Sequence, residues 1–244
     1  MTRTPERPGP PTGGPGSGAF RDGRSWRVDH PAPRSPPVAE IVLFHSAYGL
    51  RPAVHRAADK LREAGHTVHT PDLYEGRTFD EPEEGTAYRD EVGNDELLRR
   101  AVTAVAPLLP AKHGLVYAGF SLGGSLAQNL ALADEQARGL VLLHGTSDLR
   151  EDAATEIAVQ LHVAQPDAYE SDDWLNTWYL QMVRAGGDVE VHRYRGAGHL
   201  YTDPELPDWD AEADRRTWVA ALAFLAELDA EAEAEDTAEA DAQD

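Results

Sequence analysis

The 244-residue sequence contains no cysteine, and this absence excludes several kinds of site. Without cysteine there is no disulfide framework, no thiolate-bound metal and no cysteine nucleophile. Long apolar runs are missing too: no stretch reaches the roughly 18 residues that a membrane span needs, so we expect no transmembrane segment. The amino-terminal residues lack the apolar segment of a secretory signal, which predicts a cytoplasmic protein.

Positive charge is also scarce. Lys60 and Lys112 are the only lysines, and 43 acidic residues outnumber 22 basic ones, giving a formal net charge of −21 at pH 7. Nucleic-acid-binding proteins need a basic face, and anionic membranes attract basic segments. The composition therefore argues against both nucleic acids and membranes as partners.

One folded domain is expected between two polar extensions. Residues 1–37 are rich in proline and glycine and bury too little apolar surface to fold, so we expect a disordered extension. Residues 230–244 alternate alanine with acidic residues, which predicts a solvated, disordered acidic tail. The remaining segment, 38–229, suits a single domain with a complete core.

Short apolar strands alternate with helical segments across the predicted domain. The strands are expected at 39–44, 66–70, 115–118, 139–143, 157–162 and 189–194. The helices are expected at 52–64, 95–109, 122–133, 171–185 and 210–228, and residues 75–92 as an exposed polar excursion available to a lid. This alternation predicts an α/β fold with a mostly parallel sheet, helices on both faces and ligands at the carboxyl ends of the strands.

The most informative motif is Gly119-Phe-Ser121-Leu-Gly123, which stands between an apolar strand and a helical segment. In that context G-x-S-x-G is typical of a nucleophile elbow, a sharp turn that exposes the serine hydroxyl at the end of the strand. The glycines leave room for the tight backbone, and the helix N-terminus directs free N–H groups toward developing negative charge. We expect Ser121 to be the nucleophile; the alternative is a glycine-rich turn without chemistry.

A serine nucleophile requires a base, and the base requires an acid that orients it. His199 is the candidate base, because it follows the last predicted strand in a glycine-containing loop. Asp167 is the candidate acid, because it follows the strand before that one. Asp148 is its main rival, and further acidic neighbours are Glu170, Asp172 and Asp173.

An oxyanion hole needs two N–H groups that converge on the reacting carbonyl. Leu122, directly after the nucleophile, is expected to supply one, and Ala47 in the loop after the first strand the other, with Ser46 as an alternative. Residues that could shape the substrate pocket, or simply pack, are Tyr48, Tyr201 and Trp174. Motifs for metal or phosphate binding are not recognisable, so we expect no metal and no cofactor.

Four motifs in this order resemble the dienelactone hydrolase family of α/β-hydrolases. They are His45-Ser-Ala-Tyr-Gly-Leu-Arg51, Pro71-Asp-Leu-Tyr74, Gly119-Phe-Ser-Leu-Gly123 and Tyr194-Arg-Gly-Ala-Gly-His199. The resemblance covers roughly residues 38–228. It implies a compact hydrolase core with little lid, a Ser121–His199–Asp167 triad, and an oxyanion hole at Ala47 and Leu122.

The chain departs from the family pattern at three positions. Well-known members use a cysteine where this chain has Ser121, and a glutamate where it has Ser46. Those members also hold a substrate carboxylate with arginine side chains. In this chain, Asp203 stands after His199 at a position where such an arginine would be expected.

We therefore expect a serine hydrolase of small-molecule carboxylic esters or lactones, working through an acyl-enzyme; the sequence makes no prediction of oligomeric state. Two alternatives remain: a non-catalytic small-molecule or partner-binding protein on a hydrolase scaffold, and an acyltransferase.

Overall fold

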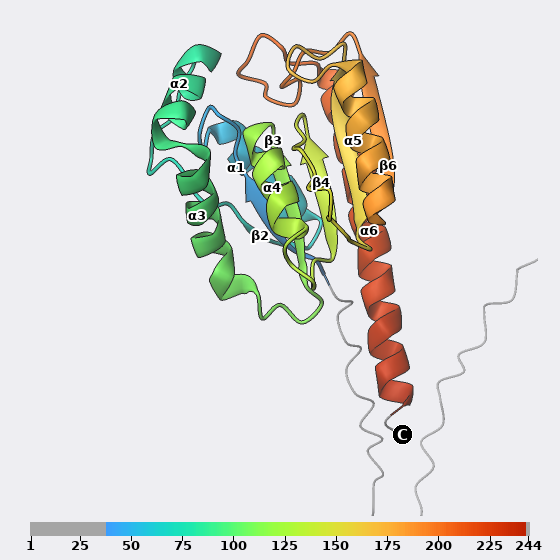
Figure 1. Ribbon diagram of the computed structural model, residues 1–244. Coiled ribbons are helices and arrows are strands. Elements are labelled where there is room, and N and C mark those ends of the chain that lie inside the picture. The colour runs from blue at the N-terminus through green and yellow to red at the C-terminus, as the bar shows by residue number, and fades with distance from the viewer. Residues whose placement is uncertain (1–37, 243–244) are drawn as a thin grey trace, which may run out of the picture. The chain divides into compact units, whose positions relative to one another are not determined.

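Six parallel strands form the centre of the molecule in the computed structural model, which describes residues 38–242 (Figure 1). The strands are β1 (Glu40–Phe44), β2 (Thr67–His69), β3 (Leu115–Phe120), β4 (Gly139–Leu143), β5 (Ala158–Gln165) and β6 (Asp188–Arg195). They lie in the order β2-β1-β3-β4-β5-β6, and every neighbouring pair is parallel. The expected extension at 1–37 lies outside the described residues.

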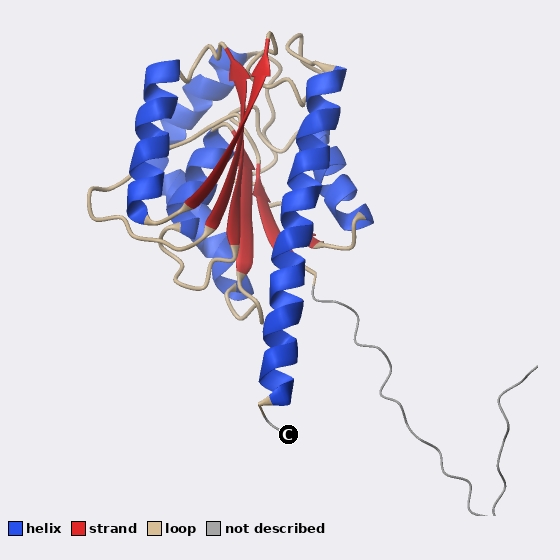
Figure 2. Ribbon diagram, turned by 90° about the vertical axis from the view of Figure 1, so that its right-hand side faces the viewer, coloured by secondary structure: helices blue, strands red, loops and turns tan. Residues whose placement is uncertain are grey.

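Helices cover both faces of the sheet (Figure 2). They are α1 (Pro52–Glu63), α2 (Pro82–Val92), α3 (Asn94–Val105), the short 3₁₀ helix η1 (Ala106–Leu108), α4 (Leu122–Ala131), α5 (Asp172–Ala185) and α6 (Ala211–Asp241). One apolar core joins α3, α4 and α5 to the sheet, and a second joins α1 and α6 to the opposite face. The predicted α/β fold with helices on both faces is confirmed.

Alternation along the strands explains the two cores. In β1, Val42 and Phe44 belong to the first core, whereas Ile41 and Leu43 belong to the second. Successive side chains of a strand point to opposite faces, and a parallel sheet covered on both faces therefore needs continuous apolar strands. All residues of β3 and β4 are buried. These central strands end at the same edge of the sheet, where their loops meet.

The polar segment expected as an excursion contains α2 (Pro82–Val92). Pro82 fits the first turn, and Glu83 and Glu84 lie beside the positive end of the helix dipole. Gly85 is buried because it lies directly against the carbonyl of Ala47. The helix thus packs against the loop that follows β1, above the carboxyl ends of the strands (Figure 1).

The last helix is longer than we expected, and a disordered tail from residue 230 is wrong for the described part. α6 continues to Asp241, because alanine and glutamate are strong helix formers. Ala232 is buried, Arg138 Nη1 lies 2.9 Å from Glu235 Oε1, and Lys112 pairs with Asp236. Within residues 38–242 no helix, α6 included, combines the length and apolar character that crossing a bilayer requires.

Trp178 on α5 offers a test of the first core. The side chain is 1% exposed, and its Nε1–H donates to Gln128 Oε1 at 2.9 Å. Trp178→Ala should lower the free energy of unfolding by about 3–5 kcal/mol, because it leaves a cavity and removes one of the two hydrogen bonds to Gln128 Oε1, the other coming from the Ser147 N–H. The neighbouring Tyr179 is 39% exposed, and Tyr179→Ala should change stability by less than about 1 kcal/mol. Urea unfolding measures the free energy of unfolding of both variants. Equal losses of stability in the two variants would contradict the packing described for Trp178.

Candidate active site

Ser121 lies in a strained turn between β3 and α4. Its φ and ψ are 50° and −110°, a region that non-glycine residues rarely adopt. Neighbouring glycines make the turn possible: a Cβ on Gly123 would lie 2.5 Å from the carbonyl oxygens of Phe44 and His45, and one on Gly145 would lie 2.6 Å from Ser121 Cα. Backbone therefore packs directly on backbone around the serine.

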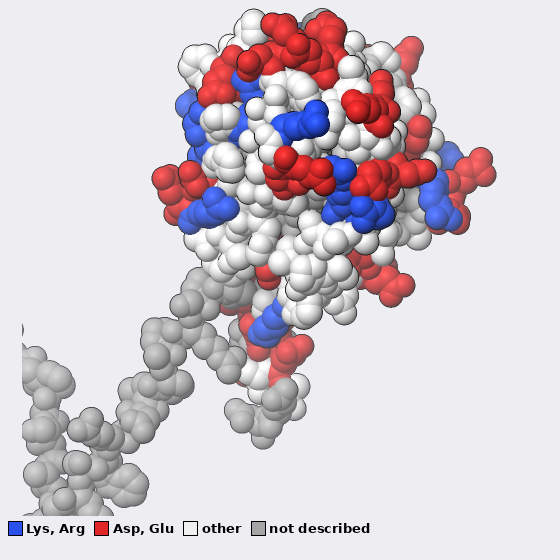
Figure 3. All heavy atoms as spheres, turned by 90° about the vertical axis from the view of Figure 1, so that its left-hand side faces the viewer, with Lys and Arg blue, Asp and Glu red and all other residues white. Residues whose placement is uncertain are grey.

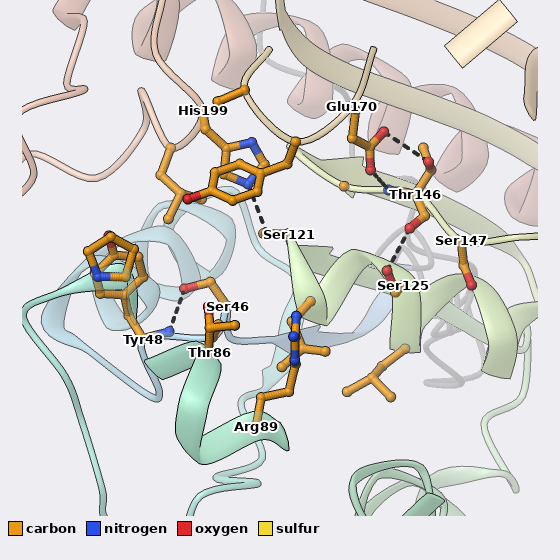
Figure 4. Close-up of a pocket in the computed structure, with 18 of the residues that line it drawn as sticks. Ser46, Tyr48, Thr86, Arg89, Ser121, Ser125, Thr146, Ser147, Glu170 and His199 are labelled. Carbon is orange, nitrogen blue, oxygen red and sulfur yellow. Dashed lines mark hydrogen bonds between the residues drawn. The ribbon is translucent and has the colours of Figure 1, made fainter. Parts of the chain in front are cut away.

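The structure brings together the three residues predicted for a triad. Ser121 Oγ lies 2.9 Å from His199 Nε2 (Figure 4). His199 Nδ1 lies 2.8 Å from Asp167 Oδ2 and 3.0 Å from Oδ1. His199 comes from the loop after β6 and Asp167 from the loop after β5. The rival Asp148 forms no hydrogen bond to His199.

The charge of Asp167 fixes the roles of the two imidazole nitrogens. Burial raises the pKa of Asp167, but the hydrogen bond and charge of His199 lower it. The amides of Tyr169 and Glu170, which donate to Oδ1 at 2.8 and 3.1 Å, lower it further, and the net pKa lies below the ordinary value. An ionised carboxylate accepts the Nδ1–H, so Nε2 is free to accept the proton of Ser121.

Two backbone amides are available beside the serine. Leu122 is the first residue of α4, so its N–H has no partner within the helix. Within residues 38–242 the N–H of Leu122 donates no hydrogen bond, and neither does the N–H of Ala47. Both residues line the same pocket as Ser121. Ser46 Oγ accepts the Tyr48 N–H at 3.3 Å and so stabilises the loop that holds Ala47.

The triad opens onto a pocket of about 1010 Å³. Tyr48 and Trp174 are among the residues that line this pocket. Of the two roles considered for Tyr201, shaping the pocket or simply packing, the structure supports packing: its side chain is 0% exposed, does not line the pocket, and makes a 2.8 Å hydrogen bond to Thr217. Tyr169 lies at the site instead, with its ring centroid 4.5 Å from that of His199. No periodic pattern distinguishes these two tyrosines in the sequence.

A buried polar network that the sequence analysis missed borders the pocket. Glu170 accepts hydrogen bonds from Thr146 N–H at 2.5 Å and from Thr146 Oγ1 at 2.9 Å. Trp174 Nε1–H donates to the same hydroxyl at 2.8 Å. Ser125 Oγ donates to the Thr146 carbonyl at 2.6 Å (Figure 4). Burial raises the pKa of Glu170, and the bonds from Thr146 oppose that rise. In the sequence, Glu170 is only one of several acids after a strand.

Two buried histidines support the loops around the site. His45 Nε2 accepts the N–H of Leu73 at 3.1 Å, and His144 Nε2 lies 2.7 Å from Thr202 Oγ1. Burial lowers the pKa of both imidazoles, which are therefore neutral packing groups. Neither lines the pocket. Within residues 38–242 no three histidine, aspartate or glutamate side chains are grouped as metal ligands.

Comparison with known proteins gives a family match over most of the chain. The sequence pattern of the dienelactone hydrolase family matches residues 27–228. Protein usf of Aquifex pyrophilus is 23% identical over 203 residues, which cover 77% of this chain and 87% of that protein.

Solved structures show the same fold. A dienelactone hydrolase-like promiscuous phosphotriesterase from metagenomic libraries is 23% identical, with a TM-score of 0.68 over 80% of this chain and 88% of that one. A thermophilic esterase of Thermogutta terrifontis, solved with propionate bound, is 17% identical, with a TM-score of 0.59 over 81% of this chain and 87% of that one.

The lowered pKa of Asp167 predicts a stability that depends on pH. A depressed carboxyl pKa stabilises the folded state above the ordinary pKa of the group, and this contribution is lost as pH falls through the folded value. Asp167→Asn should therefore be less stable than the wild type at pH 7, by about 1 kcal/mol or more, with the difference shrinking only as pH falls below the ordinary carboxyl pKa of 3.8. Urea unfolding across this range measures it, with Asp148→Asn as the control. A difference that stays constant with pH would contradict the assignment.

Proposed function

This chain belongs to the dienelactone hydrolase family, hydrolases that act on ester bonds, and we propose that it cleaves carboxylic esters or lactones through an acyl-enzyme on Ser121. The observation that carries the proposal is the continuous hydrogen-bond chain from Ser121 Oγ through His199 to Asp167. A hydroxyl becomes a nucleophile when a base within hydrogen-bond reach removes its proton, and this chain supplies such a base.

In the first half of the reaction, Ser121 Oγ attacks the substrate carbonyl while His199 Nε2 takes the hydroxyl proton. Asp167 stabilises the imidazolium that forms. The carbonyl oxygen becomes an oxyanion, which accepts hydrogen bonds from the N–H groups of Ala47 and Leu122. His199 then returns the proton to the departing alcohol oxygen, and the acyl group remains on the serine.

In the second half, a water molecule replaces the alcohol. His199 Nε2 takes a proton from the water, whose oxygen attacks the acyl carbon, and the same two N–H groups bind the second oxyanion. The proton passes to Ser121 Oγ as the acyl–enzyme bond breaks, releasing the carboxylic acid. A lactone follows the same steps, except that the alcohol stays attached to the acyl chain until the product leaves.

The replacement of the family's usual cysteine and glutamate suits this mechanism. Ser46 stands where the resemblance places the glutamate, and its hydroxyl accepts a backbone N–H. A serine is activated by transfer of its proton to His199 during attack, so it does not depend on a second carboxylate to form an anion beforehand. The similar esterase of Thermogutta terrifontis supports the ester as substrate class.

Covalent labelling tests the nucleophile. A fluorophosphonate probe should label the wild-type protein, and Ser121→Ala should abolish the label, since the probe reacts with a serine that a histidine activates. Ser125→Ala is the matched control: Ser125 lines the same pocket, but its hydroxyl donates to the Thr146 carbonyl and has no adjacent base. Labelling that persists in Ser121→Ala, or is absent from the wild type, would refute the proposal.

Replacing the acid tests the orientation of His199. Asp167→Asn should lower kcat/KM for p-nitrophenyl acetate by about 10³- to 10⁴-fold, because an asparagine cannot hold the required tautomer or stabilise the imidazolium. Asp173 is an exposed acid in the first turn of α5, and Asp173→Asn should retain the wild-type rate. Similar rates for both variants would mean that another group orients the base.

A further inference from the structure

The pocket around Ser121 is lined by acidic side chains that mostly lack a counter-ion. Five of its carboxylates form no ion pair within residues 38–242: Glu81, Asp95, Asp148, Glu170 and Asp208. Arg89 is the only lysine or arginine among the lining residues, and its guanidinium already donates to Asp90 Oδ1 at 2.6 Å. Figure 3 shows acidic side chains gathered along the upper edge of the face that carries α2 and α3.

The acids are spread around the cavity rather than grouped at one point. No three acidic or histidine side chains of the described residues approach one another closely enough to bind a metal ion together. Glu170 is buried and accepts two hydrogen bonds from Thr146, so its carboxyl group is less accessible to a ligand than those of the exposed acids. The remaining carboxylates give the pocket a negative potential, which attracts cationic molecules and repels anionic ones.

One side of the pocket combines acids with aromatic rings. Tyr169 lies beside His199 and is 68% exposed, so much of its ring is open to a ligand. Tyr48 lies nearby: burial raises its pKa, the proximity of Tyr169, Asp208 and Glu81 raises it further, and the charge of Arg51 opposes this rise. In Figure 4, Tyr48 and Glu170 lie on opposite sides of Ser121, which separates this aromatic side from the network of Thr146.

Asp208 brings a negative charge next to the catalytic loop. A Cβ on Gly198 would lie 2.7 Å from Asp208 Oδ1, so the carboxyl group packs directly on the residue before His199. Asp203, which stands where the family has an arginine for a substrate carboxylate, is buried with its Oδ2 3.6 Å from Arg51 Nε. Among the described residues that line this side of the site, none therefore offers an unpaired lysine or arginine to a substrate carboxylate.

We propose that the natural substrates are esters that carry a positively charged ammonium group, bound between the rings of Tyr48 and Tyr169 and the carboxylates of Asp208 and Glu81. This inference rests on the proposed hydrolase function of Ser121. Aromatic faces attract cations through the quadrupole of the ring, and nearby carboxylates add a direct attraction. The ring of Tyr48 already contacts one cation within the protein, since the Arg51 guanidinium lies 5.4 Å from the centre of the ring.

Three acetate esters of similar shape but different charge test whether the charge of the substrate, rather than its size, determines the rate. Acetylcholine carries a trimethylammonium group, 3,3-dimethylbutyl acetate replaces its nitrogen by carbon, and 3-sulfonatopropyl acetate carries a negative charge. We expect kcat/KM, measured by titration of the released acid, to be about tenfold or more higher for acetylcholine than for the neutral ester, and lowest for the anion. Raising NaCl from about 0.05 to 0.5 M should reduce the preference, because salt screens the carboxylates.

Substitutions of single carboxylates test which residues cause the preference for acetylcholine. Asp208→Asn and Glu81→Gln should each lower the ratio of kcat/KM for acetylcholine to that for the neutral ester by several-fold. Glu63→Gln is the control, because Glu63 is an exposed carboxylate on α1 outside the pocket, and its removal should leave both the rates and the ratio unchanged.

The outcomes distinguish this inference from the proposed function. Turnover that depends on Ser121 but shows no preference for acetylcholine overturns the inference and leaves the hydrolase proposal intact. A preference that survives both acidic substitutions also overturns it. If the wild type neither turns over any of the esters nor reacts with the fluorophosphonate probe, the proposed function fails as well.

Discussion

Close contact between backbones at the carboxyl end of β3 is the constraint on which the site depends. Gly123 lies against the carbonyl groups of Phe44 and His45, and Gly145 lies against Ser121 from the side of β4. A serine with positive φ costs about 1–3 kcal/mol, and such strain persists only where the surroundings determine it. Three adjacent strands supply those surroundings, so the sheet itself holds the hydroxyl in place.

The acidic residues of this chain act differently according to their surroundings. Asp167 is buried with His199 and two amides, and these partners keep it ionised. Glu170 is buried against Thr146, where it fixes the side of the pocket that carries Trp174. Asp208 is exposed and unpaired within the described residues, so its charge remains available to a ligand. Burial and hydrogen bonding, more than residue type, determine what each carboxyl group does.

Much of the fold and part of the site were predictable from the sequence. Continuous apolar runs such as residues 115–118 predict buried parallel strands, because only a strand covered on both faces can be apolar throughout. The glycines around Ser121 predict the sharp turn, since no other residue fits there. Chain order indicates His199 as the base, because loops after parallel strands meet at one edge of the sheet. These inferences depend on local composition and on topology, which a sequence determines directly.

Only the tertiary structure decided which loop residues reach the site. Asp148 and Asp167 both follow strands, but the path of each loop leaves only Asp167 in contact with His199. Likewise Tyr201 is buried in the core while Tyr169 lies against the imidazole, although nothing local distinguishes the two. Loop paths depend on packing against segments distant in the sequence, such as α2 against the loop of Ala47. Strand periodicity and turn chemistry are local properties, whereas side-chain placement in loops is decided by the whole fold.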